Sequence, residues 1–184
     1  MAVTQWMCWE GALHLAATTR PGFDAPNLVL HVARTVATPV GTAAAGWLEW
    51  RPEPGRPPAL HGFLCMDALV GSYFGPKLWA GTPFEKAPVL PGQISFATKL
   101  PHAASARVQV GGHVFEVSLD AIAPQQLVQR AAAHPMPFAQ QGVEAAAGAV
   151  ALKVNGQNLA ATVPKVSDLG GPGATGSACG LFAR

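Results

Sequence analysis

The stretch ARVQVGGHVFEVSL, from Ala106 to Leu119, contains two alternating runs separated by a Gly-Gly pair. Alternation of apolar and polar residues is typical of a half-buried strand, and a two-residue glycine turn is typical of a β-hairpin. Pairing outward from the turn places Val110 opposite His113 and Arg107 opposite Glu116. Because side chains alternate across a strand, one face of this predicted hairpin is apolar. That face carries Val108, Val110, Phe115 and Val117.

A second hairpin is predicted by the stretch VALKVNGQNLAATV, from Val150 to Val163. Its Asn-Gly pair, residues 155–156, tolerates the left-handed backbone that a type I′ turn requires. Pairing outward from this turn places Val154 opposite Gln157 and Leu152 opposite Leu159. Two separate stretches therefore indicate antiparallel strands that are joined by tight turns.

Apolar runs with strand character recur along the rest of the chain, at intervals of about 8–15 residues, with glycine and proline between them. The clearest runs are residues 27–36, 42–52, 59–71 and 93–100. Such spacing is typical of an all-β domain. We therefore expect an antiparallel β-sandwich of roughly eight to ten strands, formed by residues 1–166 as a single domain.

Three segments depart from the strand pattern. Asp120 can cap a helix, and the good helix formers of APQQLVQRAAAH predict one short helix over about residues 121–134. The stretch FAQQGVEAAAGA, residues 138–149, suggests a second helical turn. The final stretch SDLGGPGATGSACGLFAR, residues 167–184, is rich in glycine and has little periodicity, which predicts a flexible C-terminal tail.

The composition is low in charge. Only 12% of the 184 residues are charged, whereas about 25% is usual, and the net charge is +2. Little electrostatic repulsion then opposes contact between copies, so we expect self-association into a homo-oligomer. The lysines and arginines are scattered without a basic patch, which argues against nucleic-acid binding.

The sequence also indicates a compartment. No apolar run approaches the roughly 18 residues of a membrane-spanning helix, so no membrane association is expected. The N-terminal stretch lacks a basic region followed by an apolar one, which argues against a secretory signal. Three widely spaced cysteines, Cys8, Cys65 and Cys179, are then best read as free thiols in a reducing environment. We therefore expect a cytoplasmic protein.

Motifs for catalysis are weak in this sequence. Residues 171–177, GPGATGS, have the glycine spacing of a phosphate-binding loop but lack its lysine. Ser177 lacks the flanking strand and helix of a nucleophile elbow. Only Glu49 and Glu53 are close among the carboxylates, and they flank a proline in a loop. The sequence therefore predicts no catalytic residue and no cofactor, and it favours a protein that is not an enzyme.

A metal site would need converging histidine, cysteine or carboxylate ligands. His61, Cys65 and Asp67 alternate onto one strand face, but residues four apart on a strand stand about 13 Å apart, so His61 and Cys65 cannot share an ion. The remaining metal candidate is His31 with His61 and an unspecified third ligand.

The aromatic residues are the stronger candidates for a binding site. Several of them occupy a glycine- and proline-rich stretch, SYFGPKLWAGTPF, residues 72–84, and another lies on a strand at Trp47. Aromatic loops on a β-scaffold stack on sugars or contact proteins, but they also cap cores. The candidate ligand-binding residues are Tyr73, Phe74, Trp79 and Trp47.

Four stretches between Asn27 and Leu119 together show a resemblance: NLVLHV, PVGTAAAGWLEW, RPPALHGFL and VQVGGHVFEV. Their order resembles a bacterial family known only as a domain of unknown function. The resemblance covers about half of the chain and implies a small β-sandwich of bacterial origin. It implies no activity and no site residues.

These observations favour a non-catalytic binding or structural module that associates with itself. One alternative is a β-sandwich that binds a carbohydrate or another small ligand, or a protein, through the aromatic loop. Another alternative is an enzyme whose site is assembled from distant residues.

Overall fold

The computed structural model describes residues 5–99, 102–132, 138–168 and 170–184. The strands are β1 (Trp6–Ala17), β2 (Leu28–Thr38), β3 (Gly41–Trp50), β4 (Leu60–Cys65), β5 (Val89–Leu90), β6 (Gly92–Lys99), β7 (Ala103–Val110), β8 (His113–Ile122), β9 (Gln126–Arg130), β10 (Ala139–Val154), β11 (Gln157–Leu159) and β12 (Ala174–Ala183). A short helix, α1 (Ala68–Tyr73), continues into a π-helical turn, η1 (Phe74–Leu78).

All of these strands belong to one sheet with the order β5-β4-β3-β2-β1-β12-β10-β8-β7-β6, while β9 and β11 pair with β10 beside this path. The pairing is antiparallel except between β4 and β5. The all-β prediction is confirmed, and the sheet is nearly closed and barrel-like.

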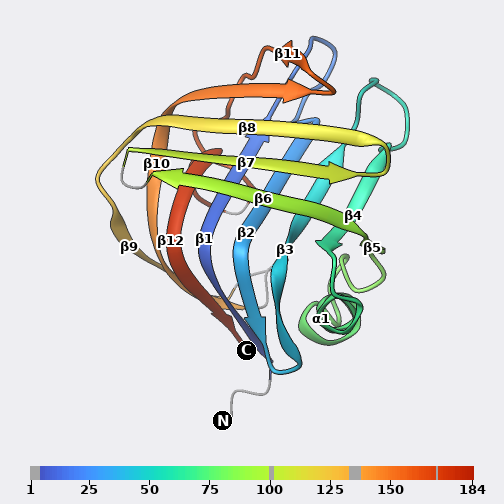
Figure 1. The fold of residues 1–184 in the computed structure, drawn as a ribbon, viewed down its shortest axis with the longest axis vertical. Coiled ribbons are helices and arrows are strands. Elements are labelled where there is room, and N and C mark those ends of the chain that lie inside the picture. Colours follow the sequence, from blue (N-terminus) through green and yellow to red (C-terminus); the bar gives the residue numbers. More distant parts are fainter. Residues whose placement is uncertain (1–4, 100–101, 133–137, 169) are drawn as a thin grey trace.

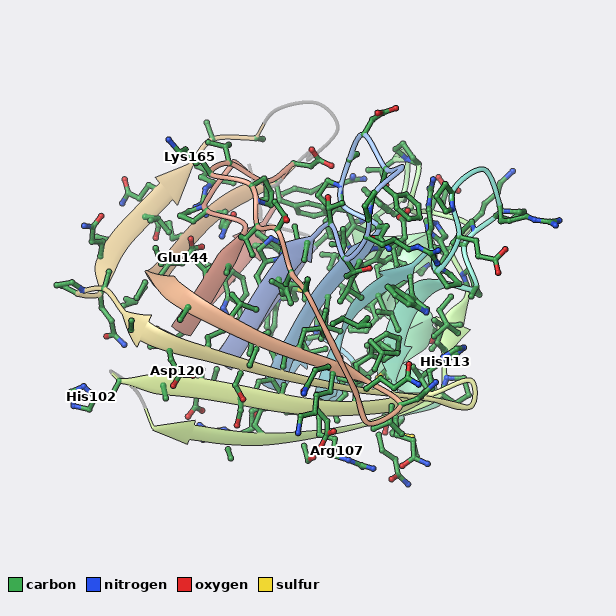
Figure 2. All side chains as sticks on the ribbon, turned by 90° about the horizontal axis from the view of Figure 1, so that it is seen from above. His102, Arg107, His113, Asp120, Glu144 and Lys165 are labelled. Carbon is green, nitrogen blue, oxygen red and sulfur yellow. The ribbon has the colours of Figure 1, made fainter. Side chains whose placement is uncertain are left out.

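Two layers of strands pack face to face and cross each other (Figure 1). Strands β1 to β4 and β12 form the back layer, and β6, β7 and β8 form the front layer. Strand β10 belongs to both, because its first half pairs with β12 and its second half pairs with β8. Figure 2 shows the same two layers from above. The sheet therefore folds over itself and encloses its own core.

That main core lies between the layers and is built from the inward residues of both. Leu13, Leu15, Leu30 and Leu48 of the back layer meet Phe115 of the front layer, and all five are fully buried. Burial of one such side chain stabilises the fold by about 1.5–3 kcal/mol. The alternation seen in the sequence directs these side chains inward.

The first predicted hairpin is confirmed with its register, and the second is confirmed for the three residue pairs next to its turn, since β11 ends at Leu159. Strands β7 and β8 pair Val110 with His113 and Arg107 with Glu116. Strands β10 and β11 pair Leu152 with Leu159. In both cases, the alternation and the turn residues lie within one short segment, so the local sequence was sufficient.

The predicted helix over residues 121–134 is wrong for the residues that the structure describes. Residues 126–130 form β9, which pairs with residues 140–144 of β10, and residues 133 and 134 lie outside the described ranges. The predicted helical turn over 138–149 is also wrong, because residues 139–149 belong to β10. Helix propensity is a weak preference that a ladder of tertiary hydrogen bonds overrides.

The prediction of a flexible tail over residues 167–184 is wrong for most of its length. Ala174–Ala183 form β12, which pairs with β1 on one side and with β10 on the other. This strand lies between β1 and β10 in the back layer (Figure 1). Its glycines conceal the strand pattern in the sequence, yet both of its edges are hydrogen-bonded.

The strand predicted over residues 59–71 is confirmed only for Leu60–Cys65, because residues 68–71 belong to the helix α1, which the sequence analysis did not predict. The Asp67 side chain accepts a hydrogen bond from the backbone N–H of Val70 at 2.9 Å and thereby caps α1. The chain then turns back over the outer face of β3 and β4. Within the described ranges, no helix has the length and apolar character needed to cross a bilayer.

Candidate functional site

A cavity of about 240 Å³ lies on the outer face of the back layer, opposite the main core. Its floor comes from β1, β2 and β3, and its walls come from the segment that carries α1 and η1 and from the loop after Pro164. The side chains of this floor are short, because Ala33 pairs with Ala12 on one side and with Ala45 on the other. Three alanines in a row across three strands leave space that larger side chains would fill.

The strands present side chains to this cavity in a way that simple alternation does not predict. Trp9 and His14 both line it, although one has an odd number and the other an even one. The reversal occurs at Gly11, which has a φ of +62°, a backbone conformation that glycine adopts at little cost. Strand β2 shifts its register against β3 between Ala33 and Val36, at the same level of the sheet.

Aromatic rings build most of the wall. Trp47 contacts Phe63 and Phe84 edge to face, with ring centroids 5.0 Å and 4.9 Å apart. Trp79 lies 5.4 Å from Phe84 by the same measure. Trp9 contacts Phe182 at 4.9 Å. Such edge-to-face contacts each add about 0.5–1.5 kcal/mol beyond area burial.

Two histidines lie in this apolar surrounding. His14 of β1 pairs directly with His31 of β2, and their ring centroids are 5.5 Å apart. The His14 side chain is buried, and neither of its ring nitrogens has a hydrogen-bond partner among the described residues. Nδ1 of His31 likewise has none. Both side chains line the cavity. Buried polar atoms without partners are uncommon, and each one calls for an explanation.

Burial also determines the charge of this pair. Burial, together with smaller contributions from His31 and Arg130, lowers the pKa of His14 to about 3. Burial lowers the pKa of His31 as well, although Glu144 opposes that change. Desolvation disfavours the charged form of a histidine. Both imidazoles are therefore neutral at physiological pH, and each offers one donor and one acceptor.

An ion pair lies close to the histidines. Both terminal nitrogens of the Arg130 guanidinium donate hydrogen bonds to the Glu144 carboxylate, each at 2.8 Å, and Nε2 of Gln140 donates a third to the same group. This pairing raises the pKa of Arg130. Glu144 and the loop that carries Lys165 lie on the same side of the molecule (Figure 2). The charges of Arg130 and Glu144 thus largely neutralise each other.

A third residue of the lining also carries an unpartnered polar atom. Oγ of Ser167 is buried without a hydrogen-bond partner in the described part of the chain, and Ser167 lines the cavity. Its loop is held by a backbone hydrogen bond from Ser167 to Gly171 at 2.7 Å. Exposed residues of this loop, Val166 and Asp168, also contribute to the lining, so the cavity reaches the surface there.

The structure brings three of the four predicted ligand-binding residues together. Phe74, Trp79 and Trp47 all line the cavity. Tyr73 does not line it; its buried hydroxyl accepts a hydrogen bond from the backbone N–H of Trp6 at 3.1 Å. The aromatic residues therefore pack as a second core and, at the same time, border an open space.

The pairing considered for a metal, His31 with His61, does not form. His31 lies opposite Trp47, and His61 lies one strand further along, opposite Glu49, whose carboxylate it contacts at 3.2 Å. In the ranges that the structure describes, no group of three histidine, cysteine or acidic residues could hold a metal ion. Cys65 is buried, and burial raises the pKa of its thiol.

Sequence reasoning missed the most informative polar residues of the cavity. His14 was not singled out, because nothing local connects it to His31 seventeen positions later. Ser167 was placed in the tail. A signal did exist: His14 and His31 are each the only polar residue within an apolar strand segment, LHL and LHV.

No protein-family model, no curated protein and no solved structure matches this chain. The resemblance of residues 27–119 to a bacterial family therefore stays a prediction, and the arguments on function below rest on the geometry.

Proposed function

We propose that this protein is a non-catalytic binding module for a small, mainly apolar ligand, which it holds in the cavity over the back layer. The observation that carries this proposal is the combination of an aromatic wall with unpartnered polar atoms in one space of about 240 Å³. Ligand sites in proteins are typically concave and apolar, with a few polar groups that orient the ligand.

The size of the cavity suggests the size of the ligand. An apolar cavity of about 150 Å³ accommodates benzene. A cavity of about 240 Å³ therefore fits a molecule of roughly two fused rings. Three tryptophans of the lining would stack on a flat ring system: Trp9, Trp47 and Trp79. Their fluorescence emission should therefore change when such a ligand binds.

Naphthalene, a neutral two-ring probe, tests this proposal. We expect saturable quenching of tryptophan emission and a rise in the melting temperature, because a ligand that binds only the folded state stabilises it. The variant Ala33→Phe fills the floor of the cavity and should weaken binding at least about tenfold. Ala151→Phe, at an exposed position of β10, is the matched control and should bind as the original protein does. Non-saturable quenching that both variants share would contradict the proposal.

We further propose that the protein associates with itself through a patch around α1. Seven large apolar side chains are exposed in the described residues, and four of them, Val40, Met66, Leu69 and Val89, border this helix. Val89 abuts Gly71 of α1, and Gly41, next to Val40, abuts Val70. Clustered exposed apolar residues mark contact surfaces, and the low charge of the chain leaves little repulsion between copies.

We also propose a reducing, cytoplasmic location. All three cysteines of the chain are described, and none forms a disulfide. Free thiols are the usual state in such a compartment.

A further inference from the structure

Polar side chains from three segments line the cavity in which the histidine pair lies. His14 and His31 lie side by side on β1 and β2, and Ser167 reaches the same cavity from the loop after Pro164. All three carry buried polar atoms that lack a hydrogen-bond partner within the described ranges. The rest of the lining is almost entirely apolar. A ligand that satisfies these atoms must therefore bring its own polar group into this cavity.

The charges around this cavity decide what kind of polar group fits. Arg130 lies close enough to His14 to lower its pKa, but the carboxylate of Glu144 already occupies its guanidinium. Two further carboxylates, Glu49 and Asp168, line the cavity. Glu49 contacts Arg51 at 2.7 Å and His61 at 3.2 Å. Among the described residues that line the cavity there is no lysine or arginine, so an anionic ligand would meet acidic groups in this wall and no positive one.

A neutral hydroxyl group matches the two imidazoles. A neutral imidazole has one N–H donor and one nitrogen acceptor, and a hydroxyl group donates one hydrogen bond while it accepts others. One hydroxyl placed between the rings can thus donate to one histidine and accept from the other. Desolvation keeps the His14 imidazole neutral, which preserves this complementarity.

We propose that the ligand of this cavity is a neutral aromatic alcohol or phenol whose hydroxyl group binds between His14 and His31 while its rings lie against the aromatic wall. This inference rests on the proposed function, because it names the chemical class that the same cavity selects. The histidines are then specificity-determining residues, and the tryptophans and phenylalanines supply the apolar contact.

Three probes of one ring system test the inference: 2-naphthol, naphthalene and 2-naphthoate. We expect 2-naphthol to bind at least about tenfold more tightly than naphthalene, since its hydroxyl makes two hydrogen bonds that are otherwise unmade. We expect 2-naphthoate to bind more weakly than either. The variant His14→Phe should reduce the preference for 2-naphthol toward one, measured as the ratio of the 2-naphthol and naphthalene affinities of the variant itself, because the hydroxyl then loses one of its two partners.

The outcomes separate the two proposals. Equal affinities for 2-naphthol and naphthalene would overturn the role of the histidines and leave the binding function standing. Tightest binding of 2-naphthoate would overturn the choice of a neutral ligand. No saturable binding of any probe would overturn both. If His14→Phe does not fold, the ¹⁵N resonances of the histidine rings in the original protein decide: they should shift with 2-naphthol and not with naphthalene.

Discussion

His14 and His31 place polar ring nitrogens in a space whose walls are aromatic. Burying a polar group without a hydrogen bond costs about 1–3 kcal/mol by protein mutational data. A phenylalanine at position 14 or 31 would avoid that cost and fill part of the cavity. Residues that lower the stability of a fold in this way are concentrated at functional sites.

The first prediction concerns the dependence of stability on pH. Burial lowers the pKa of both His14 and His31, so the unfolded chain binds more protons than the folded protein below about pH 6.5. The free energy of unfolding should be largest above that pH and should fall below it, by up to about 1.4 kcal/mol per pH unit for each histidine. For His14 the loss continues until the pH reaches its folded pKa of about 3. Urea unfolding at about pH 7.5, 6 and 5 measures this slope.

The control is the variant that combines His14→Phe with His31→Phe. This variant retains every other titratable group of the chain. The difference between the two slopes therefore isolates the histidines. Parallel slopes for the two proteins would show that the pair does not titrate differently on folding.

At the scale of single elements, β12 shows how a glycine-rich stretch becomes a strand that is paired on both edges. Gly180 pairs with Trp9 of β1, and the Trp9 indole lies directly over the place where a side chain of residue 180 would begin. Nε1 of Trp9 donates a hydrogen bond to Oγ of Ser177 on the same strand at 2.9 Å. The indole of β1 thus covers β12 and supplies the packing that its own glycine lacks.

This packing leads to a prediction for Gly180→Ala. The added Cβ would collide with the Trp9 ring, which is buried and has little room to move. We expect a loss of about 1–3 kcal/mol in the free energy of unfolding and a change in tryptophan emission. Gly148→Ala on β10 is the control, because its nearest contacts are 3.2 Å away at Ala121 and need only a small adjustment. Equal losses for the two variants would show that Trp9 does not constrain position 180.

Strand β9 lies where the sequence predicts a helix. Residues 121–134 are good helix formers, yet residues 126–130 pair with β10. The Arg130 guanidinium reaches across this ladder to Glu144. The helical preference of a short segment amounts to a few tenths of a kcal/mol per residue, and cross-strand hydrogen bonds and an ion pair outweigh it.

At the scale of the whole molecule, both faces of the back layer are covered. One face packs on the front layer, and the other packs on the segment that carries α1 and η1. Large apolar side chains remain exposed around α1, beside that second face. The proposed surface for self-association therefore lies next to the proposed ligand cavity but uses different residues.

The corresponding prediction is a homodimer in solution. Sedimentation equilibrium of the original protein should show a species of twice the chain mass of 19.0 kDa. Combining Met66→Lys with Leu69→Lys should shift the protein to a monomer, because lysines on both copies bring like charges into an apolar contact. Leu127→Lys, which changes an equally exposed leucine on β9, should leave the dimer unchanged. A monomer at every concentration of the original protein would contradict the prediction.

The sequence by itself determined the features that a few neighbouring residues encode. The registers of the two hairpins, the all-β class and the aromatic character of residues 72–84 all follow from alternation and turn chemistry within short segments. The tertiary structure alone decided the place of β12, the strand in residues 126–130 and the meeting of His14 with His31. Each of these depends on hydrogen bonds and packing between segments that are distant in the chain, and no local pattern of residues records them.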